Sequence, residues 1–230
     1  MVQLVSGFAS SAAAARSGFR AIILGAPGSG KGTISARIVD LLRVTHISTG
    51  DKLRQHIADR TELGERVKRY LDSGNLVPDD VMINLIDREI NALKGKNNWL
   101  LDGFPRTLSQ AEALQRIQPV CLVINVDIPH RVIIDRLKNR WVHLPSGRVY
   151  NLGFNDPKVP GRDDVTNEPL SQRPDDRPEI VEKRLQRHAE MSASVIAFYE
   201  RLNLLKSFSG ETTDSIWPSI QQHLTQFLEV

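Results

Sequence analysis

The sequence contains the stretch Gly25-Ala26-Pro27-Gly28-Ser29-Gly30-Lys31-Gly32-Thr33, directly after the apolar run 21–24. Apolar residues then recur at helical spacing over 34–42, so the stretch joins a predicted strand to a predicted helix. Glycines at such a junction let the backbone curl so that successive N–H groups bind phosphate oxygens, and Lys31 would reach the β- and γ-phosphates. A turn that only caps a helix is the alternative. The strand before the loop and the lysine within it favour a nucleotide-phosphate site.

The loop lacks the hydroxyl residue that usually follows its lysine and binds Mg²⁺. Gly32 stands at that position, and the hydroxyl of Thr33 comes one residue later. A magnesium ion must therefore be held by phosphates, waters and carboxylates elsewhere in the chain. Asp102 ends the apolar run 99–101 and is the first candidate, with capping of the next turn as its alternative. Asp51 is a second candidate, for which helix N-capping is an equal alternative.

Composition and charge limit the class of protein. Of the 230 residues, 40% are hydrophobic and 25% charged, as in soluble globular proteins, and no apolar run approaches the roughly 20 residues of a membrane span. The net charge of +3 is concentrated in residues 1–39, which contain no acidic residue. The nearly neutral remainder argues against a nucleic-acid surface. Residues 1–19 are rich in Ala and Ser and lack acids, as in mitochondrial targeting segments; a tail without targeting function is the alternative.

Short apolar runs alternate with amphipathic stretches. This alternation predicts an α/β fold of the phosphate-loop type, with a central parallel five-stranded sheet between two helical layers. Ligands of such sheets bind at the carboxyl ends of the strands. The single cysteine, Cys121, falls in one of the runs and is expected to be a buried strand residue. The runs are 21–24, 45–48, 99–101, 120–126 and 207–209, and helical patterns cover 30–42, 51–60, 62–73, 79–94, 107–117, 129–140, 178–203 and 213–228.

The segment 141–176 breaks this alternation, because it contains five prolines and three glycines and has no helical period. A structureless loop of this length is uncommon in a compact domain, so we expect a small β-rich subdomain or lid. His143 and Ser146 form one pair of polar residues, and Asp163 and Thr166 form another at the same spacing. Hydroxyl groups are poor zinc ligands, so we predict a hydrogen-bonded cluster and no zinc.

Two pairs of arginines stand at helical spacing. Arg136 and Arg140 are four residues apart in the pattern 129–140, and we expect them to share a helix face. Arg184 and Arg187 are three apart in the pattern 178–203. Like charges so placed repel each other unless an anion or carboxylates lie between them, and the planar guanidinium suits phosphate oxygens. We interpret Arg136, Arg140 and Arg184 as phosphate ligands and Arg187 as a surface residue.

Several segments together resemble the adenylate kinase family, over a region from about residue 20 to the C-terminus. The resemblance rests most on the phosphate loop and on Leu-Asp-Gly-Phe-Pro-Arg-Thr, which follows a predicted strand. The segments are Gly25–Thr33, Ser48–Arg54, Gly74–Asp80, Leu101–Thr107, Trp141–Asn151 and Gln172–Asp176.

The resemblance implies a division into domains and a set of site residues. Residues 20–48, 79–140 and 178–230 would form the core phosphate-loop domain, residues 49–78 a helical NMP-binding insertion, and residues 141–177 the lid. The implied ligands of the donor nucleotide are Gly28, Ser29, Gly30, Lys31, Gly32, Thr33, Arg136, Val149, Tyr150 and the backbone of Thr212. The implied ligands of AMP are Thr49, Arg54, Leu76, Val77, Gly103, Arg106, Gln110, Arg173 and Arg184. The implied catalytic residues are Lys31, Arg106, Arg140, Arg173 and Arg184, with Asp102 holding Mg²⁺ through water.

The implied activity is a reversible, Mg²⁺-dependent transfer of a γ-phosphoryl group to AMP. Such a transfer needs alignment and charge neutralisation, which a ring of arginines supplies, and a closing lid would exclude water. Asn151 stands where many ATP-using members have His, and with the segment 141–143 it resembles a mitochondrial branch that converts GTP and AMP to GDP and ADP. A weakly active sister branch carries Gln in place of Arg173. The presence of Arg173 favours the active branch, so we expect GTP as the donor and a location in the mitochondrial matrix. We also expect the protein to be a monomer.

Other functions remain open at this point. An ATP:AMP kinase of the same fold is the first alternative. A GTPase-like switch would need a guanine-reading Asn-Lys-x-Asp segment, which the sequence lacks. The presence of Arg140, Arg173 and Arg184 argues against a weakly active nucleotide-binding protein. We expect no nucleic-acid partner and no membrane insertion.

Overall fold

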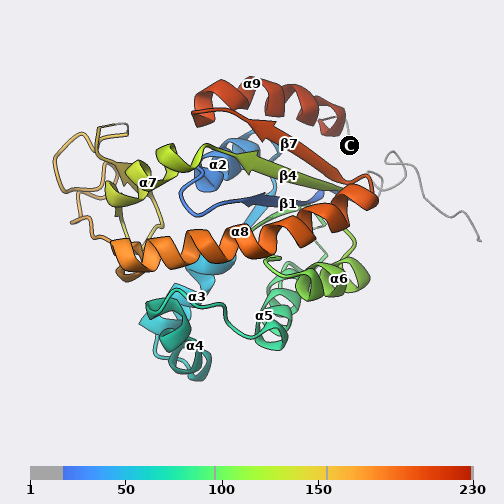
Figure 1. Ribbon diagram of the computed structural model, residues 1–230, viewed down its shortest axis with the longest axis horizontal. Helices are drawn as coiled ribbons and strands as arrows, with labels where there is room; N and C mark the ends of the chain where they lie inside the picture. The colour runs from blue at the N-terminus through green and yellow to red at the C-terminus, as the bar shows by residue number, and fades with distance from the viewer. Residues whose placement is uncertain (1–17, 96, 154, 229–230) are drawn as a thin grey trace, which may run out of the picture.

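The computed structural model describes residues 18–95, 97–153 and 155–228. Its centre is a parallel five-stranded sheet in the order β2-β3-β1-β4-β7 (Figure 1). Strand β1 is central, and Ile22 on it is aligned with Leu101 on one side and Val123 on the other. The predicted fold class is confirmed. The strands are β1 (Arg20–Gly25), β2 (Thr45–Ser48), β3 (Trp99–Asp102), β4 (Leu122–Asp127) and β7 (Leu205–Ser209).

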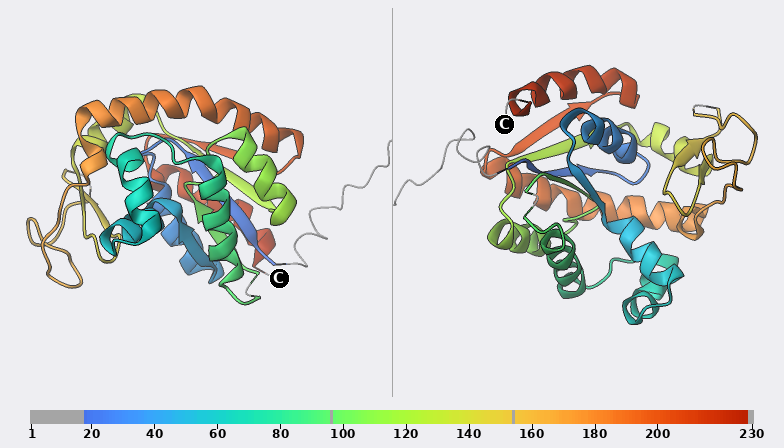
Figure 2. Two further views of the ribbon diagram at one scale, coloured as in Figure 1. Left: turned by 90° about the horizontal axis from the view of Figure 1, so that it is seen from below. Right: turned by 180° about the vertical axis from the view of Figure 1, so that it is seen from behind.

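Helices cover both faces of the sheet because alternate strand residues point to opposite faces. Ile23 packs with Ile38 and Ile220 in one hydrophobic core, whereas its neighbour Ile22 packs with Ile86 in the other. Figure 1 shows α9 above the strands and α8, α6 and α5 below them, and the view from behind in Figure 2 shows α2, drawn in blue, in front of the strands. The first core contains residues of α2 (Lys31–Leu42), α7 (His130–Lys138) and α9 (Thr213–Leu224), and the second contains residues of α5 (Asp79–Asn91) and α6 (Leu108–Ile117). Helix α8 (Pro178–Arg201) contributes Val181 and Leu185 to the first core and Val195 and Tyr199 to the second.

Two segments project from this layered core (Figures 1 and 2). The first is a hairpin of α3 (Thr49–Ala58) and α4 (Glu62–Asp72), whose helices begin with side-chain caps from Ser48 and Thr61. The second contains the antiparallel pair β5 (Arg140–Val142) and β6 (Val149–Asn151) and ends at the 3₁₀ helix η1 (Pro174–Asp176). A further 3₁₀ helix, η2 (Thr225–Phe227), follows α9.

Each predicted helix and strand is present, but two local predictions are wrong. Helix α7 ends at Lys138, and Arg140 begins strand β5, so Arg136 and Arg140 do not share a helix. Cys121 precedes β4 and is only half-buried, so it is not a buried strand residue; its thiol donates to the carbonyl oxygen of Arg20 at 3.3 Å. Of the two alternatives given for Asp51, helix N-capping is excluded, since Ser48 is the N-cap of α3 and Asp51 lies in its first turn. Among the described residues, no helix is both long and apolar enough to cross a lipid bilayer.

Candidate active site

The phosphate loop joins β1 to α2 at the carboxyl edge of the sheet. Gly28 and Gly30 have positive φ angles of 82° and 87°. A Cβ atom on Gly28 would lie 2.8 Å from Leu137 Cγ, and one on Gly30 would lie 2.4 Å from Thr213 Cγ2. Both positions therefore require glycine, for the backbone angle and for space. Because Gly30 has no side chain to cap α2, the first N–H groups of that helix remain available to an anion.

The side chain of Lys31 lies inside the curled loop. Its Nζ donates hydrogen bonds to the carbonyl oxygens of Gly25 and Ala26, both at 2.8 Å. Burial lowers the pKa of Lys31 to about 8, while the nearby carboxylate of Asp102 acts in the opposite direction. Anionic phosphates at this position would stabilise the charged form of the lysine and restore its pKa.

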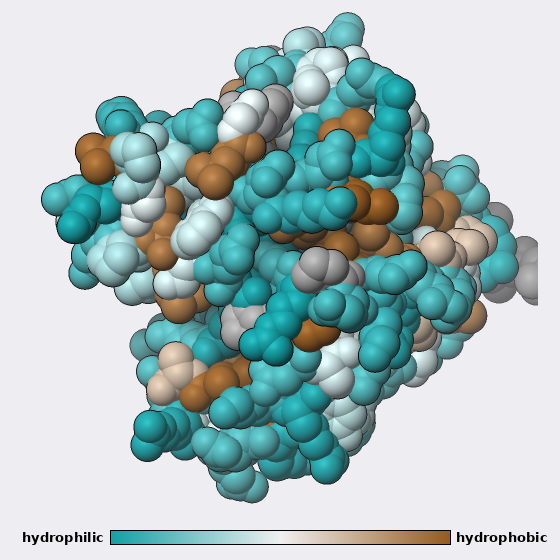
Figure 3. All heavy atoms as spheres, turned by 60° about the vertical axis from the view of Figure 1, so that its left-hand side comes forward, coloured by the Kyte–Doolittle hydropathy of each residue, from teal (hydrophilic) through white to brown (hydrophobic). Residues whose placement is uncertain are grey.

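A cavity of about 700 Å³ opens in front of the loop. Figure 3 shows the molecule with this side turned forward, where the surface is hollowed between an upper and a lower lobe and hydrophilic residues predominate. Predicted donor and catalytic residues from distant parts of the chain meet here. They are Gly28, Gly30, Lys31, Gly32, Thr33, Asp102, Arg106, Arg136, Arg140, Val149, Arg173 and Arg184.

Four of these arginines come from four different segments. Arg106 follows β3, Arg140 begins β5, Arg173 precedes η1, and Arg184 lies on α8. Burial lowers the pKa of Arg106 to about 10, and the charge of Arg184 adds to that effect, although the Arg106 side chain still meets the open space of the cavity. Burial also lowers the pKa of Arg173 to about 10, with a further contribution from Arg54. The cluster thus concentrates positive charge where an anion would relieve the mutual repulsion.

Carboxylates neutralise part of this charge. Asp176 forms a two-point ion pair with Arg140, in which Nε donates to Oδ2 at 2.7 Å. Arg184 Nη1 lies 2.9 Å from Asp175 Oδ2 and 3.2 Å from Asp176 Oδ1. These pairs hold the guanidinium groups in fixed orientations, and Arg106 has no carboxylate among its hydrogen-bond partners in the described chain.

A second pocket, of about 70 Å³, shares a wall with the main cavity. Leu53, Leu71 and Met82 give it an apolar side. It brings together most of the residues predicted to bind AMP, namely Thr49, Arg54, Leu76, Val77, Gly103, Arg106, Gln110 and Arg184, whereas Arg173 lines only the main cavity.

Gln110 fixes the backbone of Arg106 at the junction of the two pockets. Its side chain is 2% exposed, and its Oε1 accepts a hydrogen bond from Arg106 N at 2.8 Å. Its Nε2 donates to Asp79 Oδ1 at 2.7 Å, and Thr107 Oγ1 donates to the other oxygen of that carboxylate at 2.8 Å. This network ties the start of α5 to the turn that carries Arg106.

The carboxylate of Asp102 faces the main cavity at the end of β3. The described part of the chain has no group of three or more His, Cys, Asp or Glu side chains arranged to hold a metal ion. A single carboxylate beside a phosphate site fits Mg²⁺, which keeps most of its ligands as water and phosphate oxygens. Asp51, the second candidate, is paired instead with Arg54 at 2.5 Å and with Arg173 at 3.4 Å.

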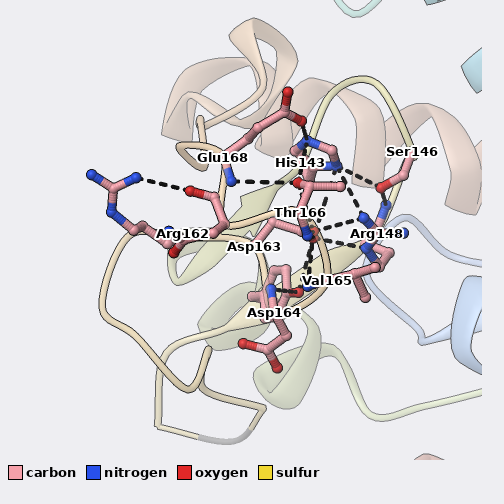
Figure 4. Close-up of polar contacts among 11 residues, drawn as sticks. His143, Ser146, Arg148, Arg162, Asp163, Asp164, Val165, Thr166 and Glu168 are labelled. Atoms are coloured by element: carbon pink, nitrogen blue, oxygen red, sulfur yellow. Dashed lines mark hydrogen bonds and ion pairs between the residues drawn. The ribbon is translucent and has the colours of Figure 1, made fainter.

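A polar network organises the segment around β5 and β6 (Figure 4). His143 Nδ1 lies 2.7 Å from Ser146 Oγ, and Thr166 Oγ1 donates to Asp163 Oδ2 at 3.0 Å. Thr166 Oγ1 also lies 3.3 Å from His143 Nε2, which joins the two pairs. The hydrogen-bonded cluster predicted for these four residues is confirmed.

Two members of this network were not predicted. Arg148 donates to both carboxylate oxygens of Asp163, at 2.7 and 2.6 Å, and these bonds hold the pKa of Asp163 well below its usual range. Glu168 Oε2 lies 2.5 Å from His143 Nε2. Tyr150 also belongs to the network, because its buried hydroxyl donates to Asp163 at 3.0 Å. Its side chain therefore lies away from the cavity, in which it was expected to bind the donor.

Other predicted donor residues also differ in position. Ser29 is fully buried beneath the loop, so its side chain is not on the cavity surface. Thr212 caps α9, and the neighbouring Thr213 lines the cavity instead. The side chain of Arg136 reaches the carbonyl oxygen of Glu211 at 3.0 Å, just before that cap.

Two titratable side chains of α8 that line the cavity were not predicted to do so. His188 lies one turn beyond Arg184, and burial together with the charges of Lys31 and Arg106 lowers its pKa to about 4. Its imidazole is therefore neutral at pH 7. Arg187, expected on the surface, is half-buried and lines the same cavity. Helical spacing from Arg184 was the available signal for both residues.

Together, the parallel sheet, the phosphate loop and the arginine cluster define a nucleotide-binding protein of the phosphate-loop class. The adenylate kinase family model matches residues 23–204, and this chain belongs to that family. A relative from Drosophila melanogaster named "GTP:AMP phosphotransferase, mitochondrial" is 53% identical over 206 residues, which cover 90% of this chain and 95% of the relative. Two Saccharomyces cerevisiae relatives of the same name are 43% and 44% identical, covering 90% and 86% of this chain and 92% of each relative.

Proposed function

We propose that this protein transfers the γ-phosphoryl group of GTP to AMP, reversibly and with Mg²⁺, giving GDP and ADP. One observation carries the proposal: the cavity at the phosphate loop and the smaller pocket meet at Arg106 and Arg184. A donor nucleotide on the loop and an AMP in the pocket would therefore direct their phosphates at one arginine cluster. The names of the three relatives support GTP as donor and AMP as acceptor.

In this proposal each part of the site has one task. Residues 28–33 and Arg136 hold the donor, and the lid, residues 141–177, closes over it with Val149 and the backbone of Tyr150. The insertion, residues 49–78, completes the AMP pocket. The AMP ligands are Thr49, Arg54, Leu76, Val77, Gly103, Arg106, Gln110, Arg173 and Arg184.

The arginines and Lys31 would stabilise the charge that spreads over the phosphoryl oxygens during transfer. Arg106 lies on the AMP side, while Arg140, Arg173 and Arg184 surround the transferring group. Fixed ion pairs with Asp175 and Asp176 keep two of these side chains oriented before substrate binds. Asp102 would hold Mg²⁺ through water, and the ion would add positive charge at the donor phosphates.

Asn151 is the cavity residue that bears on which donor base is bound. Asn151 lines the main cavity, and its amide offers both a donor and an acceptor, so it can serve guanine or adenine. A mismatched buried polar group costs about 1–3 kcal/mol, or about one to two decades in kcat/KM. The names of the three relatives favour guanine, so we expect kcat/KM for GTP to exceed that for ATP about tenfold or more.

The test is a matrix of four nucleoside triphosphates against AMP, CMP, UMP and GMP at matched Mg²⁺. GTP with AMP should give the highest kcat/KM. A GTP-to-ATP ratio at or below one would replace the donor assignment by an ATP:AMP kinase, and no transfer to AMP from any donor would overturn the function itself.

We also propose a location in the mitochondrial matrix, on the names of the relatives and the composition of residues 1–19. We propose in addition that the protein is a monomer, the state expected from its sequence. Most of that segment, residues 1–17, lies outside the described residues. A fluorescent fusion should enter the matrix, and a fusion lacking residues 1–19 should stay outside. Light scattering should give the mass of one chain.

A further inference from the structure

Arg187 makes two hydrogen bonds that cross from the core to the loop after α4. Its Nη1 donates to the carbonyl oxygen of Gly74, and its Nη2 donates to Asn75 Oδ1 at 2.8 Å. Both acceptors are neutral, and they lie side by side in sequence, so the planar guanidinium spans them as a fork. The contact joins helix α8 to the insertion at the point where the chain returns toward α5.

The loop also packs closely on α8. Gly74 has a φ angle of +69°, and a Cβ atom there would lie 2.8 Å from Ile180 Cγ2 and 3.2 Å from Arg184 Cγ. Any other residue would push the loop away from the helix. Close packing at Gly74 and the hydrogen bonds of Arg187, one turn after Arg184 on α8, therefore hold the loop against this helix.

The residues that follow Asn75 form a wall of the smaller pocket. Leu76 and Val77 line it, and Val77 is buried. The same helix presents Arg184 to both pockets. The position of Leu76 and Val77 in the pocket wall thus depends on how the loop sits on α8.

We propose that Arg187 is a positioning residue for the acceptor nucleotide. By binding Gly74 and Asn75 it fixes Leu76 and Val77 in the positions that receive the adenine base. The inference rests on the proposed AMP site and assigns this arginine an effect on the base rather than on the phosphate.

Arg187 also lines the main cavity, so direct contact with the AMP phosphate is the competing role. The two roles differ in how they affect adenosine, which carries the base without the phosphate. Loss of a positioning contact weakens adenosine and AMP by the same factor. Loss of a phosphate contact weakens AMP alone.

The experiment compares Arg187→Met with the unaltered protein by NMR titration with adenosine and with AMP, and by steady-state kinetics. Methionine keeps the apolar stem and removes the guanidinium. We expect both affinities to fall, and KM for AMP to rise, by about tenfold, the low end for a hydrogen bond from a charged group, with kcat within about twofold. Asn75→Ala removes one of the two bonds and should give a smaller change in the same direction. Arg187→Lys, which keeps one donor, should restore part of the affinity.

The matched control is Arg201→Met, on an exposed residue in the last turn of the same helix, which should change neither affinity. Unchanged adenosine binding in Arg187→Met, with or without weaker AMP binding, would overturn the inference and leave the proposed function intact. If the unaltered protein binds neither ligand, the proposed function fails as well. Should Arg187→Met not fold, Asn75→Ala and Arg187→Lys provide the same comparison.

Discussion

Asp79→Ala tests the network that holds the backbone of Arg106 in place. The Asp79 carboxylate accepts hydrogen bonds from Gln110 Nε2 and Thr107 Oγ1, and both donors are nearly buried, at 2% and 9% exposure. The threonine hydroxyl can rotate toward another acceptor, but the Gln110 amide is held by its bond to Arg106 N. Losing two hydrogen bonds to a charged acceptor and leaving one buried donor unpaired should cost about 3 kcal/mol of unfolding free energy.

For a chain of this length, about 3 kcal/mol corresponds to a fall in Tm of about 6–12 °C, measurable by calorimetry. Asp79→Asn keeps one acceptor oxygen and should lower Tm by about half as much. KM for AMP should rise in both variants, because Gln110 and Arg106 border the proposed AMP pocket.

Asp80→Ala is the matched control, because Asp80 is an exposed neighbour in the same first turn of α5. Both substitutions remove a negative charge from the helix N-terminus, so that shared effect can be subtracted. If Asp79→Ala melts within about 2 °C of the control, the network does not stabilise the fold as argued.

Three further predictions concern Lys31, Arg106 and the absence of zinc from the lid. Burial lowers the pKa of Lys31 to about 8, so about half of the Lys31 side chains are charged at pH 8. Phosphates of a bound donor would raise that pKa, so binding of the donor at pH 8 should be accompanied by uptake of about half a proton. Calorimetry in buffers of different ionisation enthalpy measures this uptake, which should vanish in Lys31→Met; proton release would contradict it. Arg106→Ala should raise KM for AMP about a hundredfold through loss of a charged phosphate contact, and unchanged AMP kinetics would remove Arg106 from the site. Finally, chelators should leave Tm unchanged, whereas stoichiometric zinc in elemental analysis would refute the metal-free lid.

Sequence patterns sufficed where the signal is local. The loop after β1 combines a strand, spaced glycines and a lysine, and apolar periodicity marked each helix, because these features depend on near neighbours in the chain. The error at Arg140 is of a different kind. Helical spacing continued past Lys138, but β5 pairs Arg140 with Asn151, and that pairing ends the helix. The spacing of residues in 129–140 cannot reveal that pairing with the later residues 149–151 ends the helix.

The residues that were missed have partners far away in sequence. Arg187 meets Gly74, and Arg148 meets Asp163, yet neither arginine stands in a pattern that specifies its acceptor. Whether two residues four apart on one helix can interact follows from the regular geometry of the helix. A fork that spans two acceptors on another element requires the relative position of both elements, which only the folded chain contains.

The order of the strands has a consequence for the newly made chain. Strand β1 leaves the ribosome first, but Ala21 pairs with Leu100 and Leu122, so it must wait for both neighbours. Strand β7 completes the sheet beside β4, and it follows every residue of the arginine cluster. A polypeptide that stopped before Leu205 would carry the whole cluster, yet one edge of β4 would keep its backbone groups unpaired. Such an edge recruits strands from other chains, so a form of the protein that lacks β7 should aggregate more readily than one that contains it.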